Sequence, residues 1–272
     1  ININEFMFEG TLNKMITEKS DPINYFIKMD TGFIHMNQLI GKKINISYTG
    51  SRCLNCNKDI VLFRQGLCKT CFFEIPSAGD WIMRPELSKA HLGVEDRDLE
   101  YEKKIQLQPH IIYLALSSHL KVGITRKSQL PTRWIDQGAH EAITLLEVPN
   151  RFLSGLGEVA LKNYYSDKTN WRKMLQNESE SVFWNEEYNK ALDFLPNELK
   201  PYMIRNDKIL ISEFKFPVDK YPTKVKSLNL SKTPNYEGKL TGIKGQYLIF
   251  DDQTVFNIRS NEGQKIKLII SN

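Results

Sequence analysis

Cysteine is scarce in this chain: only four of its 272 residues are cysteines, and all four fall between positions 53 and 71. Long apolar runs are also absent, because no stretch approaches the roughly 18 consecutive apolar residues of a membrane-spanning helix. The first residues show no basic segment followed by an apolar run, so we expect no secretory signal. These absences argue against a disulfide-rich secreted domain and a helical membrane protein. They favour a soluble cytoplasmic protein with no membrane partner.

Neither sign of charge dominates the chain. Lysine and arginine number 37 against 32 aspartates and glutamates, which gives a net charge of +5. Such an excess permits a polyanionic partner such as nucleic acid but does not require one. The hydrophobic content of 41% is enough for a packed core, so the composition excludes wholesale disorder.

The four cysteines form two CxxC pairs, Cys53 with Cys56 and Cys68 with Cys71. Each pair can place two thiolates on one tight turn, and four thiolates match the tetrahedral coordination of zinc. Two disulfides, unlinked thiols or an iron–sulfur cluster are the alternatives. Disulfides fit poorly in a chain with no sign of secretion. Because protein would fill all four coordination positions, we predict a structural zinc ion that stabilises the local fold.

Strand-like and helix-like patterns divide the chain into six segments. Short β-rich runs broken by turn residues fill both ends, whereas strand and helix patterns alternate in the middle. In chain order we predict an N-terminal β module (1–50), a zinc ribbon (51–75), a polar connector (76–108), an α/β core (109–195), an extended proline-containing linker (196–234) and a C-terminal β module (235–272). The predicted fold class is α+β.

A weak internal repeat links the two ends of the chain. Three short segments near the N-terminus recur near the C-terminus in the same order and at similar spacing. The paired segments are 8–12 with 236–240, 25–30 with 247–252, and 41–44 with 263–266. This pattern predicts two similar β modules that pack together or share a sheet. Chance similarity between amphipathic strands is the alternative.

The central segment has the order strand, strand, helix, strand, helix. The predicted elements are strands at 111–116, 120–125 and 143–148, a helix from 131 to about 137, and a helix from about 152 to 165. On the last helix, Gly155, Glu158 and Lys162 fall on a different face from the apolar stripe.

The polar residues of this segment resemble a known pattern. Tyr113, then 121–123, then Arg133, then Glu158 follow the order and spacing of the GIY-YIG nuclease core. This resemblance implies a GIY-YIG-like ββαβα core, accompanied here by the zinc ribbon and the small flanking all-β modules.

A longer stretch, about 8–176, resembles more closely a bacterial family called domain of unknown function 2797. That resemblance rests on the cysteine pairs and on residues 121–126, 133–139 and 167–171. It assigns a family and says little about function. Between the zinc ribbon and the predicted strand at 111–116, the chain holds His91 and His110 but no cysteine, so a second metal site is not expected.

The GIY-YIG resemblance implies a mechanism of phosphodiester cleavage. Glu158 would hold one divalent ion, magnesium or manganese, which would polarise a phosphate oxygen. Tyr113 would lie near the attacking water and help to deprotonate it. Arg133 would neutralise charge that develops on the phosphate. Lys121, the fourth candidate catalytic residue, would steer the nucleic-acid backbone together with Arg126.

The surrounding basic residues are candidate nucleic-acid contacts, and the pattern has two departures. The candidates are Arg126, Lys127, Lys162 and Arg172. The first glycine of the GIY element is Ile111 here, and the tyrosine of the YIG element is Lys121. The lysine is either a phosphate contact or a sign that the site no longer hydrolyses its ligand.

Each candidate also has an ordinary structural interpretation. Tyr113 in an apolar strand is typical of a core residue, and Arg133 lies on a polar helix face. Glu158 and Lys162 are four residues apart, the spacing of a surface ion pair. The sequence therefore leaves three functions open: a metal-dependent nuclease, an inactive nucleic-acid-binding protein, and a scaffold that binds a protein partner.

Overall fold

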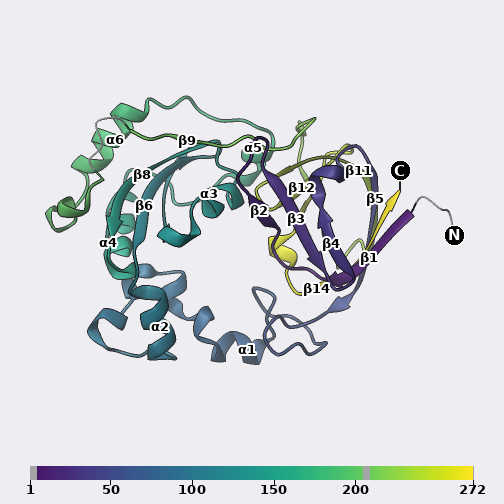
Figure 1. Cartoon of the computed structure of the whole chain (residues 1–272), viewed down its shortest axis with the longest axis horizontal. Coiled ribbons are helices and arrows are strands. Elements are labelled where there is room, and N and C mark those ends of the chain that lie inside the picture. The colour runs from purple at the N-terminus through teal and green to yellow at the C-terminus, as the bar shows by residue number, and fades with distance from the viewer. Residues whose placement is uncertain (1–4, 205–208, 272) are drawn as a thin grey trace. The chain divides into compact units, whose positions relative to one another are not determined.

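The computed structural model describes residues 5–204 and 209–271, and its helices and strands confirm the predicted α+β class (Figure 1). The chain forms two compact units. Unit 1 holds the described residues up to 72, together with 175–177 and those from 214 onward; unit 2 holds the described residues of 73–174 and 178–213. Within the described residues, no helix combines the length and the apolar character needed to cross a membrane.

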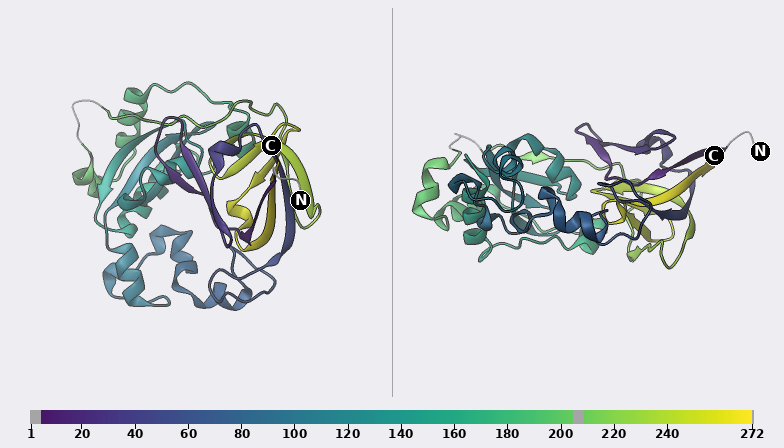
Figure 2. Two further views of the ribbon diagram at one scale, coloured as in Figure 1. Left: turned by 45° about the vertical axis from the view of Figure 1, so that its right-hand side comes forward. Right: turned by 90° about the horizontal axis from the view of Figure 1, so that it is seen from below.

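Unit 1 is built mainly from two sheets, which are antiparallel except for the parallel pairing of β10 with β13. Its N-terminal elements are β1 (Glu5–Thr11), β2 (Ile16–Glu18), β3 (Asn24–Met29), β4 (Gly32–His35), the 3-10 helix η1 (Met36–Leu39) and β5 (Lys43–Ser51). Its C-terminal elements are β10 (Lys226–Ser227), β11 (Asn235–Lys244), β12 (Tyr247–Phe250), β13 (Thr254–Asn257), η8 (Arg259–Asn261) and β14 (Gln264–Ser271). One sheet has the order β1-β14-β5-β11-β12-β13-β10, and the other has the order β2-β3-β4. Strands from the two ends of the chain, purple and yellow in Figure 2, therefore share one sheet.

The two ends pair in equivalent registers. Gly10 of β1 lies opposite Ile266 of β14, and the repeat-related Gly238 of β11 lies opposite Ile44 of β5. The turns match as well. The backbone N–H of Gly41 donates to the carbonyl of Leu240 at 2.7 Å, and that of Gly263 donates to the carbonyl of Leu12 at 2.8 Å. The strand that opens each module thus pairs with the strand that closes the other.

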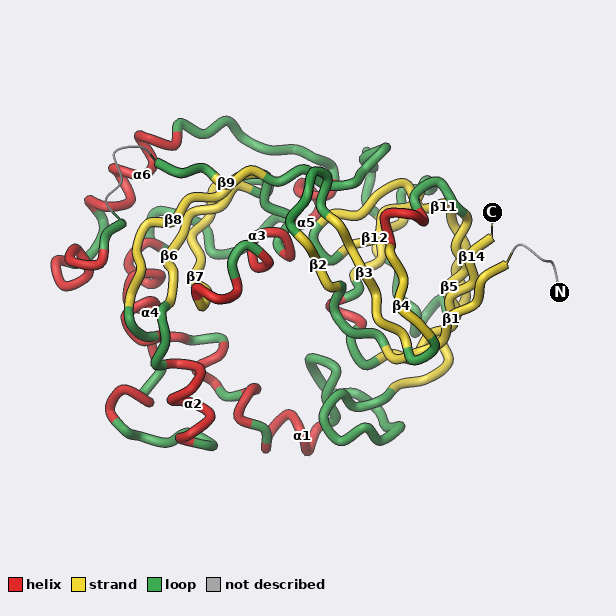
Figure 3. The backbone as a smooth tube through the Cα atoms, viewed as in Figure 1, coloured by secondary structure: helices red, strands yellow, loops and turns green. Residues whose placement is uncertain are grey.

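Unit 2 is centred on a third sheet, which is antiparallel and has the order β7-β6-β8-β9. Its strands are β6 (His110–Leu116), β7 (Leu120–Arg126), β8 (Glu141–Val148) and β9 (Ser212–Glu213). The α-helices that follow α1 (Lys69–Glu74) are α2 (Leu99–Gln106), α3 (Thr132–Asp136), α4 (Arg151–Leu161), α5 (Trp171–Leu175) and α6 (Trp184–Asp193). Every residue of β6 is buried, because the sheet is covered on both faces (Figure 3). The edge strand β7 is less buried than β6.

The two faces of β6 have different neighbours. Ile112, Leu114 and Leu116 point to one face and pack with Leu161 of α4 and Trp184 of α6. The alternate residues point to the other face, where the ring of Tyr113 meets that of Trp134 in α3, with ring centroids 5.8 Å apart. The sheet therefore separates an apolar core from a more polar layer.

The observed elements keep the predicted order in this segment, with one shortened helix. We expected the last helix to reach 165, but α4 ends at Leu161. The reason lies in the next residues, because the backbone N–H of Val122 donates to the carbonyl of Ser166 at 2.9 Å. The chain leaves the helix so that 166 can bridge to the edge strand β7.

The connector ahead of β6 is folded rather than extended. It contains the 3-10 helices η2 (Pro76–Ala78), η3 (Asp80–Ile82), η4 (Pro85–Leu87) and η5 (Ala90–Leu92), followed by α2. Helix η4 packs directly on α4 at Gly155, where a Cβ would lie 2.6 Å from the carbonyl carbon of Pro85. The remaining 3-10 helices are η6 (Lys127–Gln129) and η7 (Asn197–Tyr202).

Candidate functional site

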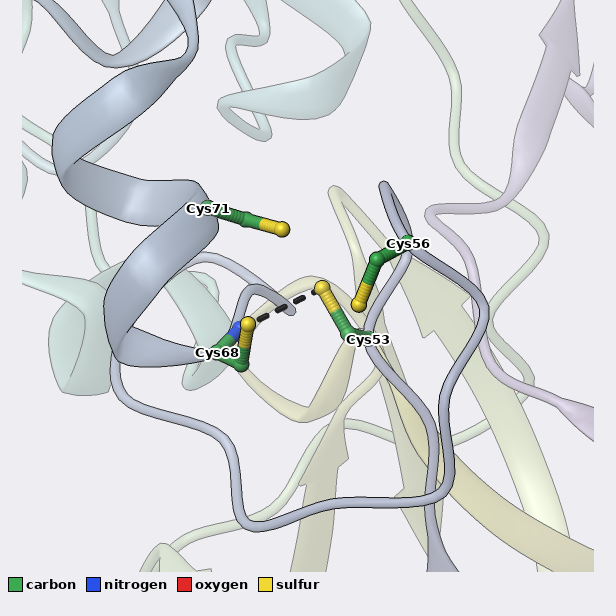
Figure 4. Close-up of side chains that lie close together, drawn as sticks. All are labelled: Cys53, Cys56, Cys68 and Cys71. Carbon is green, nitrogen blue, oxygen red and sulfur yellow. Dashed lines mark hydrogen bonds between the residues drawn. The ribbon is translucent and has the colours of Figure 1, made fainter.

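The four cysteines of unit 1 converge on one point (Figure 4). The Sγ atoms of Cys53, Cys56, Cys68 and Cys71 all lie within 4.8 Å of one another. A regular tetrahedron with zinc–sulfur bonds of about 2.3 Å has sulfur atoms about 3.8 Å apart. The cluster is therefore close to the geometry that a four-thiolate site requires.

Local backbone turns bring the two pairs together. Cys53 follows β5, and Cys68 and Cys71 lie at the start of α1. The backbone N–H of Leu54 donates to the carbonyl of Gly66 at 2.8 Å, which ties the first turn to the second. Gly66 has a φ of +72°, a conformation in which glycine avoids the strain of a side chain. These turns explain why both CxxC pairs face inward.

Hydrogen bonds to sulfur prepare the cluster for a cation. The backbone N–H of Cys68 donates to Cys53 Sγ, and the side-chain amide of Asn55 donates to Cys71 Sγ, both at 3.3 Å. Burial alone would raise the pKa of Cys53, but backbone N–H groups outweigh it and lower the pKa to about 6. The Asn55 amide lowers the pKa of Cys71, yet burial and the neighbouring cysteines raise it to about 11.

Four thiolates packed this closely would repel one another, so they need a compensating positive charge. The lowered pKa of Cys53 and the raised pKa of Cys71 fit this repulsion, because a thiolate opposes ionisation of a neighbouring thiol. A bound divalent cation removes that opposition, because metal ligation deprotonates thiols. The residues therefore fit a structural zinc ion, and among the described residues this is the one such group of metal-binding side chains.

The cysteine loop is attached to the C-terminal strand of unit 1. The backbone N–H of Arg52 donates to the carbonyl of Gly263, which directly precedes β14, at 2.8 Å. A Cβ on Gly263 would lie 3.0 Å from the Cα of Gly66, so the two loops meet backbone to backbone. Arg52 and Lys265 both contact the carboxylate of Asp59 at 3.0 Å.

A polar cleft lies within unit 2. It has a volume of about 200 Å³ and is lined by residues from the connector, β6, β7, α3, α4 and the chain after α4. Tyr113, Lys121, Arg133 and Glu158, the four predicted catalytic residues, all line it. A phenol, an amine, a guanidinium and a carboxylate from four elements therefore share one cavity.

Tyr113 and Gly123 are matched across two strands. They lie directly opposite each other in the β6–β7 pair, and directly opposed residues share a face of the sheet. A Cβ on Gly123 would lie 2.6 Å from Tyr113 Oη, so the ring rests over the glycine. The hydroxyl of Tyr113 donates to Gln137 Oε1 at 3.0 Å. Burial raises the pKa of Tyr113, and the nearby Arg133 only partly offsets this effect.

Lys121 lies on the same face of β7, opposite Ala115. Its side chain is buried, and its Nζ donates to Thr169 Oγ1 at 2.7 Å. Burial, and then the positive charge of Arg133, lower the pKa of Lys121 to about 7. Asp167 acts in the opposite direction but does not restore the ordinary value.

One face of α4 supplies the remaining charged groups. Arg151, Gly155, Glu158 and Lys162 follow the i, i+4, i+7, i+11 pattern of a single helix face. Burial raises the pKa of Glu158, while Lys162, with its Nζ 3.5 Å from the carboxylate, partly lowers it. Lys162 also contacts Asp167 at 3.3 Å.

Arg151 is a cleft residue that we did not predict from the sequence. Its Nε donates to the carbonyl of Trp81 at 3.1 Å, and its Nη2 donates to that of Ile82 at 2.8 Å. It therefore joins α4 to the connector residues that line the cleft. Helical spacing in the sequence could have identified Arg151, because it precedes Gly155 by one helical turn and Glu158 by two.

The predicted nucleic-acid contacts do not all lie in the cleft. Lys162 lines it, whereas Arg126, Lys127 and Arg172 do not. Lys127 pairs with Glu147 at 2.9 Å, and the Arg172 guanidinium lies 4.3 Å from the centroid of its neighbour's ring, Trp171. Arg126 is half-buried at the end of β7. A role for these three residues in binding stays a prediction.

The charges of the cleft define what it can hold. Four basic side chains, Lys121, Arg133, Arg151 and Lys162, face two acidic ones, Glu158 and Asp167. An excess of basic groups in a small polar cavity favours an anion with several oxygens, such as a phosphate group. A carboxylate beside that anion is the type of ligand that magnesium prefers.

Comparison with known proteins gives one positive result. No curated protein and no solved structure is significantly similar to this chain. A match to a protein family runs from residue 41 to residue 266, so it begins later than the 8–176 stretch of our expected resemblance and extends well beyond it. This match includes both the cysteine cluster and the cleft. The family is described as protein of unknown function (DUF2797), and because its model matches more than half of the chain, this chain belongs to that family.

Proposed function

We propose that this protein engages nucleic acid and cleaves phosphodiester bonds in a reaction that depends on a divalent cation. The observation that carries the proposal is the convergence of Tyr113, Arg133 and Glu158 on one cleft of unit 2. These three groups come from β6, α3 and α4, and no local pattern requires them to meet. A GIY-YIG-like core is supported by this convergence and by the strand, strand, helix, strand, helix order of the elements.

The cleft residues have distinct roles in this proposal. Arg133, with Arg151 beside it, binds the scissile phosphate and neutralises the charge that grows there as a nucleophile attacks. Glu158 offers a carboxylate oxygen to magnesium or manganese, the hard cations that suit oxygen ligands. A cation bound there would polarise a phosphate oxygen. Tyr113, whose hydroxyl proton is donated to Gln137, accepts a hydrogen bond from the attacking water and positions it.

The cysteine cluster has a separate, structural role. We assign it zinc because four thiolates at tetrahedral spacing leave no coordination position for a substrate. Free thiols persist in a reducing compartment, so a cytoplasmic location belongs to the same proposal.

The test is cleavage of supercoiled plasmid DNA and of a mixed-sequence RNA, with and without Mg²⁺. We expect cleavage that requires the cation and falls at least about 100-fold in Arg133→Ala and Glu158→Ala. Matched controls are Arg259→Ala and Glu186→Ala, which alter exposed residues outside the cleft. Unchanged cleavage in both cleft variants, with the fold intact, would reject this site.

A second function has a specific observation in its favour. The carboxylate of Glu158 is already paired with the ammonium of Lys162, and a lysine stands where the related pattern has a tyrosine. A protein that binds nucleic acid without hydrolysis would keep the basic cleft and lack turnover. Its binding would weaken steeply with salt, because phosphate contacts release counterions. Salt-sensitive binding with no Mg²⁺-dependent cleavage would select this alternative.

A further inference from the structure

Tyr113 has the properties of a hydrogen-bond donor rather than a base. Its side chain is fully buried, and burial raises its pKa above the ordinary value for a phenol. Its hydroxyl group donates to Gln137 Oε1, so the proton has a fixed acceptor. A phenol that keeps its proton at neutral pH cannot accept a second one from water.

Lys121 is an alternative base on the wall of the same cleft. In the β6–β7 pair it lies opposite Ala115, two residues from Tyr113, so the two side chains share one face of the sheet. Gly123, opposite Tyr113 and two residues from Lys121, adds no side chain to this face. The side chains of Lys121 and Tyr113 are thus diagonal neighbours, and both line the same cavity.

The amine of Lys121 is held by a neutral partner. Its Nζ donates to Thr169 Oγ1 at 2.7 Å, and Ser117 donates to the same oxygen at 3.4 Å. The acidic residue that favours its charged form, Asp167, contacts Lys162 at 3.3 Å instead. An ammonium group without a bound carboxylate gives up its proton more easily than one in an ion pair.

Burial and the neighbouring charges also favour the neutral form of the Lys121 amine. Burial and the nearby Arg133 lower the pKa of Lys121 to about 7, with Asp167 opposing them. The other titratable groups that line the cleft are Tyr113, Arg151, Glu158 and Lys162. A base is most effective when its pKa lies near the working pH, and about half of such an amine is neutral at pH 7.

We propose that Lys121, rather than Tyr113, accepts the proton of the water that attacks the phosphodiester. This inference rests on the proposed function. The neutral amine takes one proton and becomes ammonium, and the resulting hydroxide forms a bond to phosphorus. The bond from phosphorus to the leaving oxygen breaks, and that oxygen takes a proton from solvent. One product carries a terminal phosphate and the other a hydroxyl group.

A role as the base explains why an active site can have a lysine at position 121. A tyrosine at 121 would need an ionised phenol, which burial opposes. A lysine in the same setting is driven toward its neutral form, because desolvation disfavours charge. The substitution therefore changes the base without removing it.

The test is a pH profile of single-turnover plasmid cleavage in Mg²⁺, from about pH 5.5 to about 9. In the unmodified protein the rate should rise about tenfold per pH unit below pH 7 and level off above it. Lys121→Arg keeps the charge and cannot act as a base, and Lys121→Met removes both. Both should lose about 100-fold at neutral pH, and their rates should keep rising with pH throughout the range.

Control measurements separate this proposal from the proposed function. Lys103→Met, in an exposed ion pair of α2, should leave the rate and profile unchanged. If Arg133→Ala and Glu158→Ala abolish cleavage while Lys121→Arg keeps the original rate and plateau, only the role of Lys121 is overturned. If the unmodified protein never cleaves, both proposals fall.

A measurement that needs no turnover completes the test. Lysine-labelled protein, followed by NMR, should show an amine that titrates near pH 7 and is missing in Lys121→Arg. Burial also lowers the pKa of Lys244 to about 7, so the Lys244 amine should titrate in both proteins and serves as a reference. Circular dichroism and zinc content must match between the two proteins, so that a folding defect is recognised. A Lys121 midpoint above pH 9 would overturn the proposal whatever the cleavage assay shows.

Discussion

At the scale of single residues, the cleft depends on one close match between two side chains. Tyr113 is fully buried between Gly123 below its ring and Trp134 at its edge. The sequence predicted that the tyrosine and the glycine belong to one pattern. It did not show that the glycine is needed because the ring occupies the space of its missing side chain.

Gly123→Ala tests this match. The new Cβ would lie 2.6 Å from Tyr113 Oη, and the ring is fully buried and packed against Trp134, so we expect a loss of about 1–3 kcal/mol in the free energy of unfolding. Urea unfolding measures the loss. In a Tyr113→Ala background the same substitution should cost much less, since the ring is gone. Equal costs in both backgrounds would show that the clash is not the cause.

Lys162→Met tests whether Lys162 competes with a cation for the carboxylate of Glu158. The Lys162 ammonium lies 3.5 Å from the Glu158 carboxylate and competes with any metal ion for it. Removing a partly exposed ion pair should strengthen binding of Mn²⁺ about three- to fivefold, as measured by calorimetry. Lys190→Met, which alters a similar pair with Glu187, should leave Mn²⁺ binding unchanged. Weaker Mn²⁺ binding in Lys162→Met would assign the lysine a supporting role instead.

His110 makes the stability of the protein depend on pH. It is buried, and within the described residues its Nε2 has no hydrogen-bond partner. Burial lowers its pKa to about 4, whereas in the unfolded chain the value is about 6.5. The unfolded state therefore binds the proton first as pH falls, so stability declines from about pH 6.5 toward pH 4.

We expect this histidine to account for a loss of about 2 kcal/mol between pH 7.5 and pH 5. His110→Phe should lower stability at pH 7.5 through poorer packing and yet show a smaller further loss at pH 5. Urea unfolding of both proteins at the two pH values measures the difference. The same pH-dependent loss in both would mean that other groups cause it.

At the scale of elements, α4 shows what periodicity can predict. Its helical spacing, read from the sequence, places Gly155, Glu158 and Lys162 on one face, and the structure shows that face turned toward the cleft. Periodicity does not say what covers the face. The connector covers this face through backbone contact, and a contact of that kind leaves no hydrophobic pattern in the sequence.

The connector itself could be predicted only as a polar segment. Its fold depends on a buried carboxylate: Glu102 accepts hydrogen bonds from the backbone N–H groups of Asp96, Arg97 and Asp98. It also depends on Arg151, about 70 residues away in sequence, which holds the Trp81 and Ile82 carbonyls. Interactions of this kind are tertiary, so local composition does not reveal them.

Gly155→Ala tests the contact between α4 and η4. In an exposed helix this substitution would stabilise by about 1 kcal/mol, because alanine favours the helix. Here the new Cβ would lie 2.6 Å from the carbonyl carbon of Pro85, which belongs to backbone and cannot rotate away. We therefore expect destabilisation by about 1–3 kcal/mol in urea unfolding. Val159→Ala, at an exposed position of the same helix, should change stability by no more than about 0.5 kcal/mol.

At the scale of the whole molecule, residues far apart in sequence determine unit 1. The repeat could be detected from the sequence, but the exchange of strands between its two copies could not, because register is a long-range property. The cysteine cluster, in contrast, could be predicted from the CxxC spacing, since all four ligands come from one short segment. The attachment of that segment to β14 again required the structure.

This attachment predicts that metal binding stabilises the C-terminal strand as well as the cysteine loop. Arg52 donates to the carbonyl of Gly263, and Gly66 packs against the same glycine, so loss of the metal should loosen both loops together. We expect one zinc ion per chain. After removal with a chelator, amide hydrogen exchange at 52–68 and 263–266 should accelerate at least about tenfold.

Exchange in β12 provides the internal control, because its hydrogen bonds run to β11 and β13 and not to the cysteine loop. It should change little when zinc is removed. Cys56→Ser, measured without chelator, should reproduce the acceleration at 263–266, which excludes a direct effect of the chelator on the strand. If 52–68 exchanges faster while 263–266 stays protected, the loop opens without disturbing β14. The metal would then stabilise its own ligands and nothing beyond them.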